Sequence, residues 1–181
     1  MNFSRQKTVF ALLLLLLFTS CHDVKKQKQL ALIDQMIGQL DHFQQAMDEM
    51  DETEMDEIIA SVSQVVDKIK HNYNSEDTIS IEFAQRLENY KSIYAGLFFV
   101  RKTSSKLKAS IPEEKKELLQ LKSDIQKGVG DRSKYDSYIQ FEKNKISQLN
   151  VLSENCVTTK TKCVDSYHQL HNEIQAFSEE F

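Results

Sequence analysis

Apolar residues recur at alternating steps of three and four along most of the chain, and this spacing constrains the fold more than any other feature. One face of an α-helix repeats every 3.6 residues, so such a stripe predicts amphipathic helices. Residues that break helices are rare, with one Pro and four Gly among 181 residues. That scarcity favours a few long helices over many short elements. We therefore expect an all-α fold.

Three long helical regions follow from the stripes and from the turn signals between them. They cover about residues 27–71, 78–127 and 132–178. Their matched lengths indicate an elongated antiparallel three-helix bundle with coiled-coil-like packing, about 65 Å long at a rise of 1.5 Å per residue. The alternative is a four-helix bundle, because Pro112 lies within the second region and predicts a kink or a full reversal. Ser110 before it would cap the new helix.

Short groups of turn-forming and helix-capping residues predict where the turns lie. The Asn, Ser and Asp residues of 71–78 predict the first reversal, with Asp77 or Thr78 as the next N-cap. Gly128 predicts a helix end and Asp131 the following N-cap. The apolar stripe weakens across residues 48–57, which indicates a bend in the first region.

The first residues carry a targeting signal. Arg5 and Lys7 precede an unbroken apolar run over residues 9–18, and small residues follow it. This order is the signature of a secretory signal peptide. The run would rise only about 15 Å as a helix, half of a bilayer core of about 30 Å, which argues against a permanent membrane span.

The stretch Leu17-Phe18-Thr19-Ser20-Cys21 resembles the lipobox of bacterial lipoproteins, with Phe18 where the family prefers Leu. The resemblance implies cleavage before Cys21 and attachment of palmitate-like acyl chains to it. The chain would then divide into a cleaved signal peptide (1–20), a lipidated cysteine with a polar tether (21–28) and a helical bundle domain (29–181). The alternative is a soluble secreted protein that is cut nearby.

The same resemblance implies a place in the cell envelope, with the membrane as a partner through the N-terminal lipid. Residue 22 is His, and the Gram-negative sorting rule retains lipoproteins at the inner membrane when Asp follows the cysteine, so the outer membrane is favoured. The turn 128–130 and the motif Tyr167-x-x-Leu170-His171 resemble uncharacterised all-helical Gram-negative lipoproteins. That second resemblance brings no activity with it.

Charge and motifs narrow the classes of function. Residues 1–20 contain two basic residues and no acidic one, so their removal takes the net charge from −4 to −6. An acidic chain argues against a nucleic-acid partner. No phosphate loop, HExxH or GxSxG motif is present, and we expect no catalytic residue and no cofactor. The sequence favours a structural or protein-interaction role with an unknown envelope protein as partner. The alternative is ligand or metal binding in an inter-helix groove.

Cys156 and Cys163 are the thiols that remain once Cys21 is acylated. Seven residues rise about 10.5 Å along a helix, whereas a disulfide needs Cα atoms within about 7 Å, so we favour two buried thiols. An intramolecular disulfide across a helix break and an intermolecular one are the alternatives. His168 and His171 lie near Cys163, but no fourth ligand is evident, so we expect no metal site.

Two further clusters have competing interpretations. Seven of the ten residues in 48–57 are acidic. They would bind a cation or, as we favour, face the basic residues of 101–108 and set the register of two helices. The aromatic residues Tyr90, Tyr94, Phe98 and Phe99 would form a ligand groove or, as we favour, pack in the core. A third interpretation of this aromatic segment is that a partner protein covers the wide apolar face formed by residues 94–100.

Overall fold

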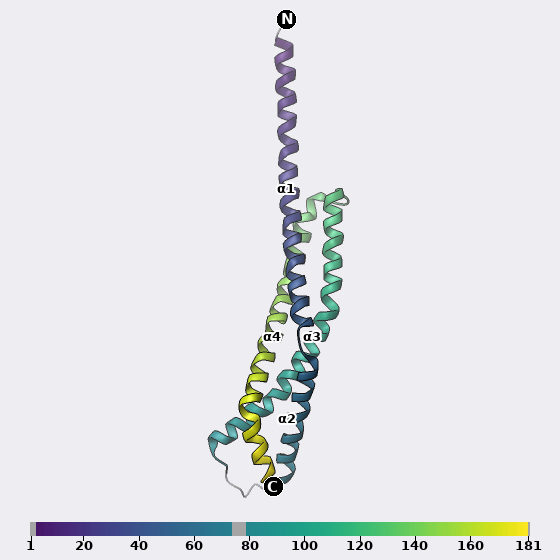
Figure 1. The fold of residues 1–181 in the computed structure, drawn as a ribbon. Helices are drawn as coiled ribbons and strands as arrows, with labels where there is room; N and C mark the ends of the chain where they lie inside the picture. Colours follow the sequence, from purple (N-terminus) through teal and green to yellow (C-terminus); the bar gives the residue numbers. More distant parts are fainter. Residues whose placement is uncertain (1–2, 74–78, 181) are drawn as a thin grey trace. The chain divides into compact units, whose positions relative to one another are not determined.

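The computed structural model consists of α-helices (Figure 1). It describes the backbone of residues 3–73 and 79–180 and the side chains of residues 24–73 and 79–180. The elements in chain order are α1 (Phe3–Asp48), α2 (Glu52–Asn72), α3 (Ile81–Lys127), the short 3-10 helix η1 (Arg132–Lys134) and α4 (Tyr135–Glu179). These described residues contain no strand, which confirms the expected all-α fold for them.

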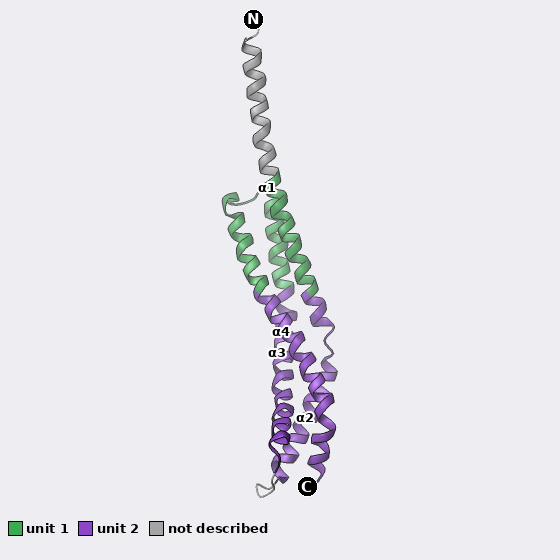
Figure 2. Ribbon diagram, turned by 90° about the vertical axis from the view of Figure 1, so that its left-hand side faces the viewer, with its two compact units in different colours: residues 1–42, 112–147 green, residues 43–111, 148–181 purple. Residues whose placement is uncertain are grey.

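The helices pack into two compact units (Figure 2). The first combines the chain up to His42 with residues 112–147, and the second combines residues 43–111 with residues 148–181. Each unit has its own apolar core, drawn from segments far apart in sequence. Buried side chains of the first include Ile33, Leu40, Leu118, Ile125, Ile139 and Ile146. Those of the second include Ile58, Val62, Tyr90, Ile93, Leu97, Val100, Cys156 and Ile174.

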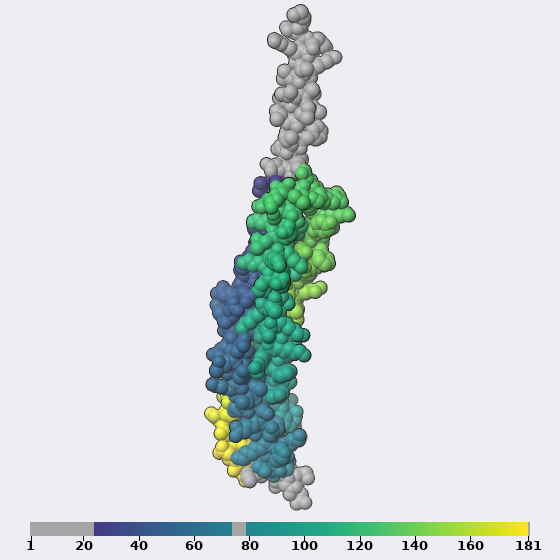
Figure 3. Space-filling view, turned by 90° about the vertical axis from the view of Figure 1, so that its right-hand side faces the viewer, coloured from purple at the N-terminus to yellow at the C-terminus, as the bar shows by residue number. Residues whose placement is uncertain are grey.

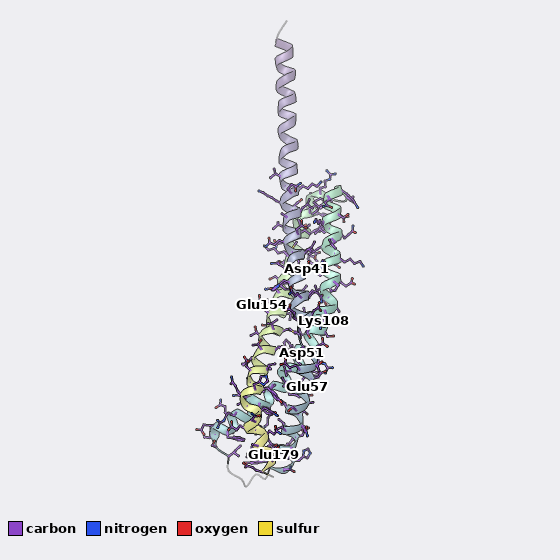
Figure 4. The ribbon with its side chains drawn as sticks, viewed as in Figure 1. Asp41, Asp51, Glu57, Lys108, Glu154 and Glu179 are labelled. Carbon is purple, nitrogen blue, oxygen red and sulfur yellow. The ribbon has the colours of Figure 1, made fainter. Side chains whose placement is uncertain are left out.

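The first expected helix is interrupted between α1 and α2. Asp51, labelled in Figure 4, is the N-cap of α2, and its carboxylate accepts a hydrogen bond from the Glu54 amide at 3.0 Å. Such a cap satisfies an amide that a new helix would otherwise leave unpaired. Met47 and Met55 are fully buried on either side of the break. The bend expected across residues 48–57 is therefore confirmed, and it takes the form of a capped helix start.

Pro112 lies inside α3, which continues on both sides of it. The expectation that Ser110 caps a new helix there is wrong, because Ser110 Oγ donates back to the Lys106 carbonyl at 2.9 Å. Proline removes one helix hydrogen bond, but Pro112 is exposed, so water can reach the freed carbonyl. Buried Ile111 and Leu118 anchor the helix on each side. The boundary between the two units crosses α3 at Pro112.

The turn between α3 and α4 follows the sequence closely. Gly128 has a φ of 67°, its amide donates to the Ile125 carbonyl, and the Val129 amide donates to Asp124. These two bonds define a Schellman motif with Gly128 at C′. Asp131 caps η1 by accepting from the amide two residues on, at 3.0 Å. The predicted glycine end and aspartate cap are both confirmed.

Two other boundaries differ from expectation. The predicted caps Asp77 and Thr78 fall among residues 74–78, outside the described residues, and Ser80 instead accepts from the Phe83 amide at 3.1 Å to begin α3. The expected polar tether also differs, because residues 24–28 belong to helix α1.

Within this part of α1, Lys25 forms an ion pair with Asp136 of α4 at 2.8 Å. Lys26 donates to the Gln126 carbonyl of α3, also at 2.8 Å. Gln29 is buried and donates to the same Asp136 carboxylate at 2.6 Å. Part of the segment that was expected to be a polar tether therefore contributes to the packing of the first unit.

Candidate functional site

Cys156 and Cys163 are free and buried in the structure. Both lie on the uninterrupted helix α4, where seven residues separate the Cα atoms by about 10.5 Å, too far for a bridge. Burial raises the pKa of both thiols, which makes them poor nucleophiles. Gly96 of α3 gives room to Cys163, because a Cβ there would lie 2.5 Å from its Sγ.

The acidic run of residues 48–57 meets basic side chains from two helices. Arg101 of α3 pairs with Asp56 at 2.8 Å, and Lys108, labelled in Figure 4, pairs with Glu52 at 2.5 Å. Lys160 of α4 pairs with Glu54 at 2.8 Å, a contact that the sequence interpretation did not include. These partly exposed pairs fit a role in helix register more than a cation site.

The four aromatic residues of α3 do not all pack in the core, so that expectation is wrong for three of them. Tyr90 is fully buried, whereas Tyr94, Phe98 and Phe99 are 43%, 52% and 44% exposed. The apolar arc of this helix is wider than the surface that α2 and α4 cover. The rings of Tyr94 and Phe98 stack on each other, with centroids 6.3 Å apart.

A groove of about 330 Å³ lies beside this aromatic pair, between α2 and α3 of the second unit. Its lining combines apolar and charged side chains: Val62, Ser63, Val66 and Asp67 from α2, and Lys91 and Tyr94 from α3. Exposed aromatic side chains next to a groove are typical of surfaces that contact other molecules.

His171 does not come together with Cys163 as a metal ligand. Its Nδ1 lies 2.7 Å from the Tyr90 hydroxyl, and its ring stacks on Tyr167 at 4.5 Å between centroids. Tyr167 in turn donates to Ser61 Oγ of α2 at 3.0 Å. This network ties α2, α3 and α4 together within the second unit.

The first unit contains a cluster of charges that the sequence interpretation missed. Lys145 of α4 forms ion pairs with Glu114 at 2.8 Å, Glu117 at 2.5 Å and Glu142 at 2.9 Å. Among the described residues, these three carboxylates form the group close enough to hold a metal ion, with ligand atoms within 4.8 Å of one another. The Lys145 ammonium contacts all three, so the chain itself supplies a cation to this cluster.

Burial and crowding change the proton affinities in this cluster. The side chains of Glu114 and Glu142 are only 11% and 13% exposed. Burial, and then a hydrogen bond to Glu142, raise the pKa of Glu114 to about 7. Burial alone would lower the pKa of Lys145, but its three carboxylate partners raise it. One ammonium therefore balances three crowded carboxyl groups, and Glu114 holds its proton more strongly than an ordinary glutamate does.

A second groove, of about 310 Å³, adjoins this cluster. Figure 3 shows the two segments that form it, the carboxyl-terminal half of α3 in green and the start of α4 in lighter green. The lining consists of Glu117, Gln120, Leu121 and Asp124 from α3 and Tyr138, Phe141 and Glu142 from α4. Glu114-x-x-Glu117 and Glu142-x-x-Lys145 are visible in the sequence, but only the packing of α3 against α4 brings them together.

Cys21 and the expected signal peptide lie outside the residues whose side chains are described. Within the described part of the chain, none of the helices has an apolar stretch that could span a lipid bilayer. Comparison with family models, with curated proteins and with solved structures gives no match.

Proposed function

We propose that the protein is a lipid-anchored helical protein of the cell envelope with a structural or protein-interaction role. The anchor rests on the lipobox-like stretch that ends at Cys21, after an n-region and an apolar run. Each buried CH₂ group contributes about 0.8 kcal/mol, so two or three acyl chains would hold the chain stably where one would not. The residue after the cysteine favours the outer membrane over the inner membrane.

We also propose that the helices form an elongated three-helix antiparallel bundle with coiled-coil-like packing, with a four-helix arrangement as the alternative. The continuity of α3 through Pro112 supports the first arrangement. The break between α1 and α2 at Asp51 supports counting a fourth helix.

The main support for the interaction role is the exposed aromatic pair Tyr94 and Phe98. The two rings are 43% and 52% exposed; Tyr94 lines the groove between α2 and α3, and Phe98 stacks on Tyr94. Aromatic side chains are enriched at the centres of protein interfaces, where they bury much area at little cost in conformational entropy. A partner that covered these rings would remove apolar surface from water.

The anchor is tested by labelling growing cells with a palmitate analogue. The protein should take up the label, and the Cys21→Ala variant should not. Label on Cys21→Ala would refute the anchor. Cys163→Ala is the matched control, because it removes a buried thiol and should leave the label unchanged.

The interaction role is tested by placing a photo-crosslinking amino acid at Phe98 in intact cells. A discrete product with one envelope protein is expected from this position. Lys70, an exposed residue of α2 in the same unit, is the control position. An absent product at Phe98, or the same products from both positions, would contradict a specific surface there.

Ligand binding in an inter-helix groove is a second candidate, favoured by the two grooves of about 330 and 310 Å³. Both fall at the low end of the range of about 300–1,000 Å³ that ligand pockets occupy. Thermal unfolding with apolar ligands and divalent metals would support this candidate through a rise in Tm, because binding to the folded state stabilises it. An unchanged Tm at saturating concentrations would refute it.

A further inference from the structure

The groove between α3 and α4 of the first unit has an unusual combination of linings. Three carboxylates, from Glu117, Asp124 and Glu142, line it together with the aromatic rings of Tyr138 and Phe141. No basic residue is among its lining residues. The groove therefore has negative charge next to flat apolar surfaces.

The aromatic rings of Tyr138 and Phe141 expose apolar surface to water, which is unfavourable in free energy. Phe141 is 61% exposed and Tyr138 is 44% exposed. The face of an aromatic ring carries partial negative charge, so it attracts a cation as well as an apolar chain. A neutral apolar ligand would cover the rings, but it would take the lining carboxylates out of water without adding a positive charge.

The chain already shows this chemistry with its own cation. Lys145 Nζ lies 5.3 Å from the centroid of the Phe141 ring while it pairs with Glu114, Glu117 and Glu142. An ammonium within about 6 Å of a ring centroid makes a favourable cation–π contact. Lys145 supplies one positive charge to three carboxyl groups, so this cluster keeps a net negative charge.

The remaining carboxylate extends the negative charge along α3. Asp124 Oδ1 accepts a hydrogen bond from the Gln120 side-chain amide at 2.8 Å, and no described basic side chain pairs with it. Glu117 is 59% exposed, so a further cation can reach it from solvent. Both groups are therefore accessible from the same open groove.

We propose that this groove binds a basic segment of a partner protein, with a Lys or Arg side chain lying across Tyr138 and Phe141. The cationic end of that side chain would lie between Glu117 and Asp124, and its methylene groups would cover the rings. This inference rests on the proposed interaction role and names the chemistry of the partner. A divalent metal fits less well, because the Lys145 ammonium already pairs with the three carboxylates that lie close enough to hold one.

The test measures binding of a fluorescein-labelled octalysine peptide to the full-length chain in a neutral detergent. Binding should be saturable and should weaken as salt increases, because exposed charges are screened. Phe141→Leu, which keeps the apolar volume but removes the ring face, should weaken binding about two- to fivefold. Glu117→Gln should weaken it by a similar factor. Circular dichroism should show both variants folded, since the two side chains are largely exposed.

Two matched variants of the second unit separate a site from general attraction. Phe99→Leu changes a ring that is 44% exposed and lies outside the proposed aromatic pair, and Glu57→Gln removes one exposed carboxylate, labelled in Figure 4. Both should bind the peptide as the parent does. No peptide binding, or equal weakening by Glu57→Gln and Glu117→Gln with none from Phe141→Leu, would overturn the inference. A crosslink at Phe98 would survive such a result, so the proposed function would stand without it.

Discussion

The hydroxyl group of Tyr90 on α3 lies 2.7 Å from Nδ1 of His171 on α4. Burial, and then the nearby hydroxyl of Tyr167, raise the pKa of Tyr90, so its hydroxyl stays protonated. Burial also lowers the pKa of His171, against a smaller opposite effect of Gln175, which favours the neutral imidazole. Each of these two side chains therefore provides the other with a hydrogen-bond partner inside the second unit.

Replacing Tyr90 with Phe should destabilise the protein by about 1–3 kcal/mol, because the ring nitrogen of His171 would lose its partner in a partly buried position. The free energy of unfolding in urea measures the effect. Tyr94→Phe removes a hydroxyl from an exposed ring and should change stability by less than about 0.5 kcal/mol. Equal losses in the two variants would contradict the role given to the hydrogen bond.

The lowered pKa of His171 predicts that acid weakens the second unit. The unfolded state takes up a proton near the usual pKa of 6.5, and the folded state resists it, so stability falls as pH drops below 6.5. Hydrogen exchange of α4 residues 160–178 between pH 5 and pH 8 measures this. His171→Gln should lose this part of the pH dependence. An unchanged pH profile in that variant would mean that another group is responsible.

The raised pKa of Glu114 predicts the opposite dependence of stability on pH in the first unit. Its folded state holds a proton up to a pKa of about 7, whereas the unfolded state releases it near 4.5. Its contribution is therefore complete at low pH and is lost as pH rises from 4.5 through 7. Glu114→Gln should stabilise residues 112–147 at pH 8 by on the order of 1 kcal/mol and have little effect at pH 4. Glu113→Gln, an exposed neighbour, should do neither.

Gly96→Ala should destabilise the second unit by about 1–3 kcal/mol, because the new methyl group would lie 2.5 Å from Cys163 Sγ. Cys163→Ala removes the clashing atom. The double variant should therefore lose less than the sum of the two single losses, by about 1 kcal/mol in denaturant unfolding. Strict additivity would show that the two residues do not press on each other.

Two glycines should respond to alanine in opposite directions. Gly128 has a φ of 67°, so Gly128→Ala should cost about 1–2 kcal/mol. Gly38 lies within α1 with nothing within 4 Å of an added Cβ, so Gly38→Ala should stabilise by about 0.5–1 kcal/mol. Melting temperatures that move the same way in both variants would contradict this assignment.

Local signals in the sequence predicted local structure well. The three-four spacing and the scarcity of Gly and Pro gave the helices, and the Gly128 end was placed correctly because its chemistry lies within a few residues. The expected cap at Ser110 was wrong because α3 continues through Pro112, with buried Ile111 and Leu118 packed on either side of it. The three-four spacing of apolar residues also does not distinguish buried from exposed positions at the edge of the apolar face of a helix. Ser153 is 4% exposed on α4, while Leu152 beside it is 40% exposed.

The candidate sites depend on contacts between helices, and these were the hardest to foresee. Glu114 and Lys145 are 31 positions apart, and no spacing rule indicates that they meet. The pairing of Arg101 and Lys108 with the acidic run was foreseen because folding a chain about residue 75 brings these positions opposite each other. The contact of Lys160 with Glu54 needed a third helix, whose rotation about its axis the sequence does not specify.

The break between α1 and α2 is enclosed by thioethers. Met47 and Met55 are fully buried, and Met50 is 7% exposed, around the point where the helical hydrogen bonds are interrupted. Flexible, unbranched side chains fill irregular space well, which suits them to a helix break. Oxidation would turn each thioether into a polar sulfoxide inside apolar packing. The junction that joins α1 to α2 is therefore also the place where oxidative damage would loosen the second unit.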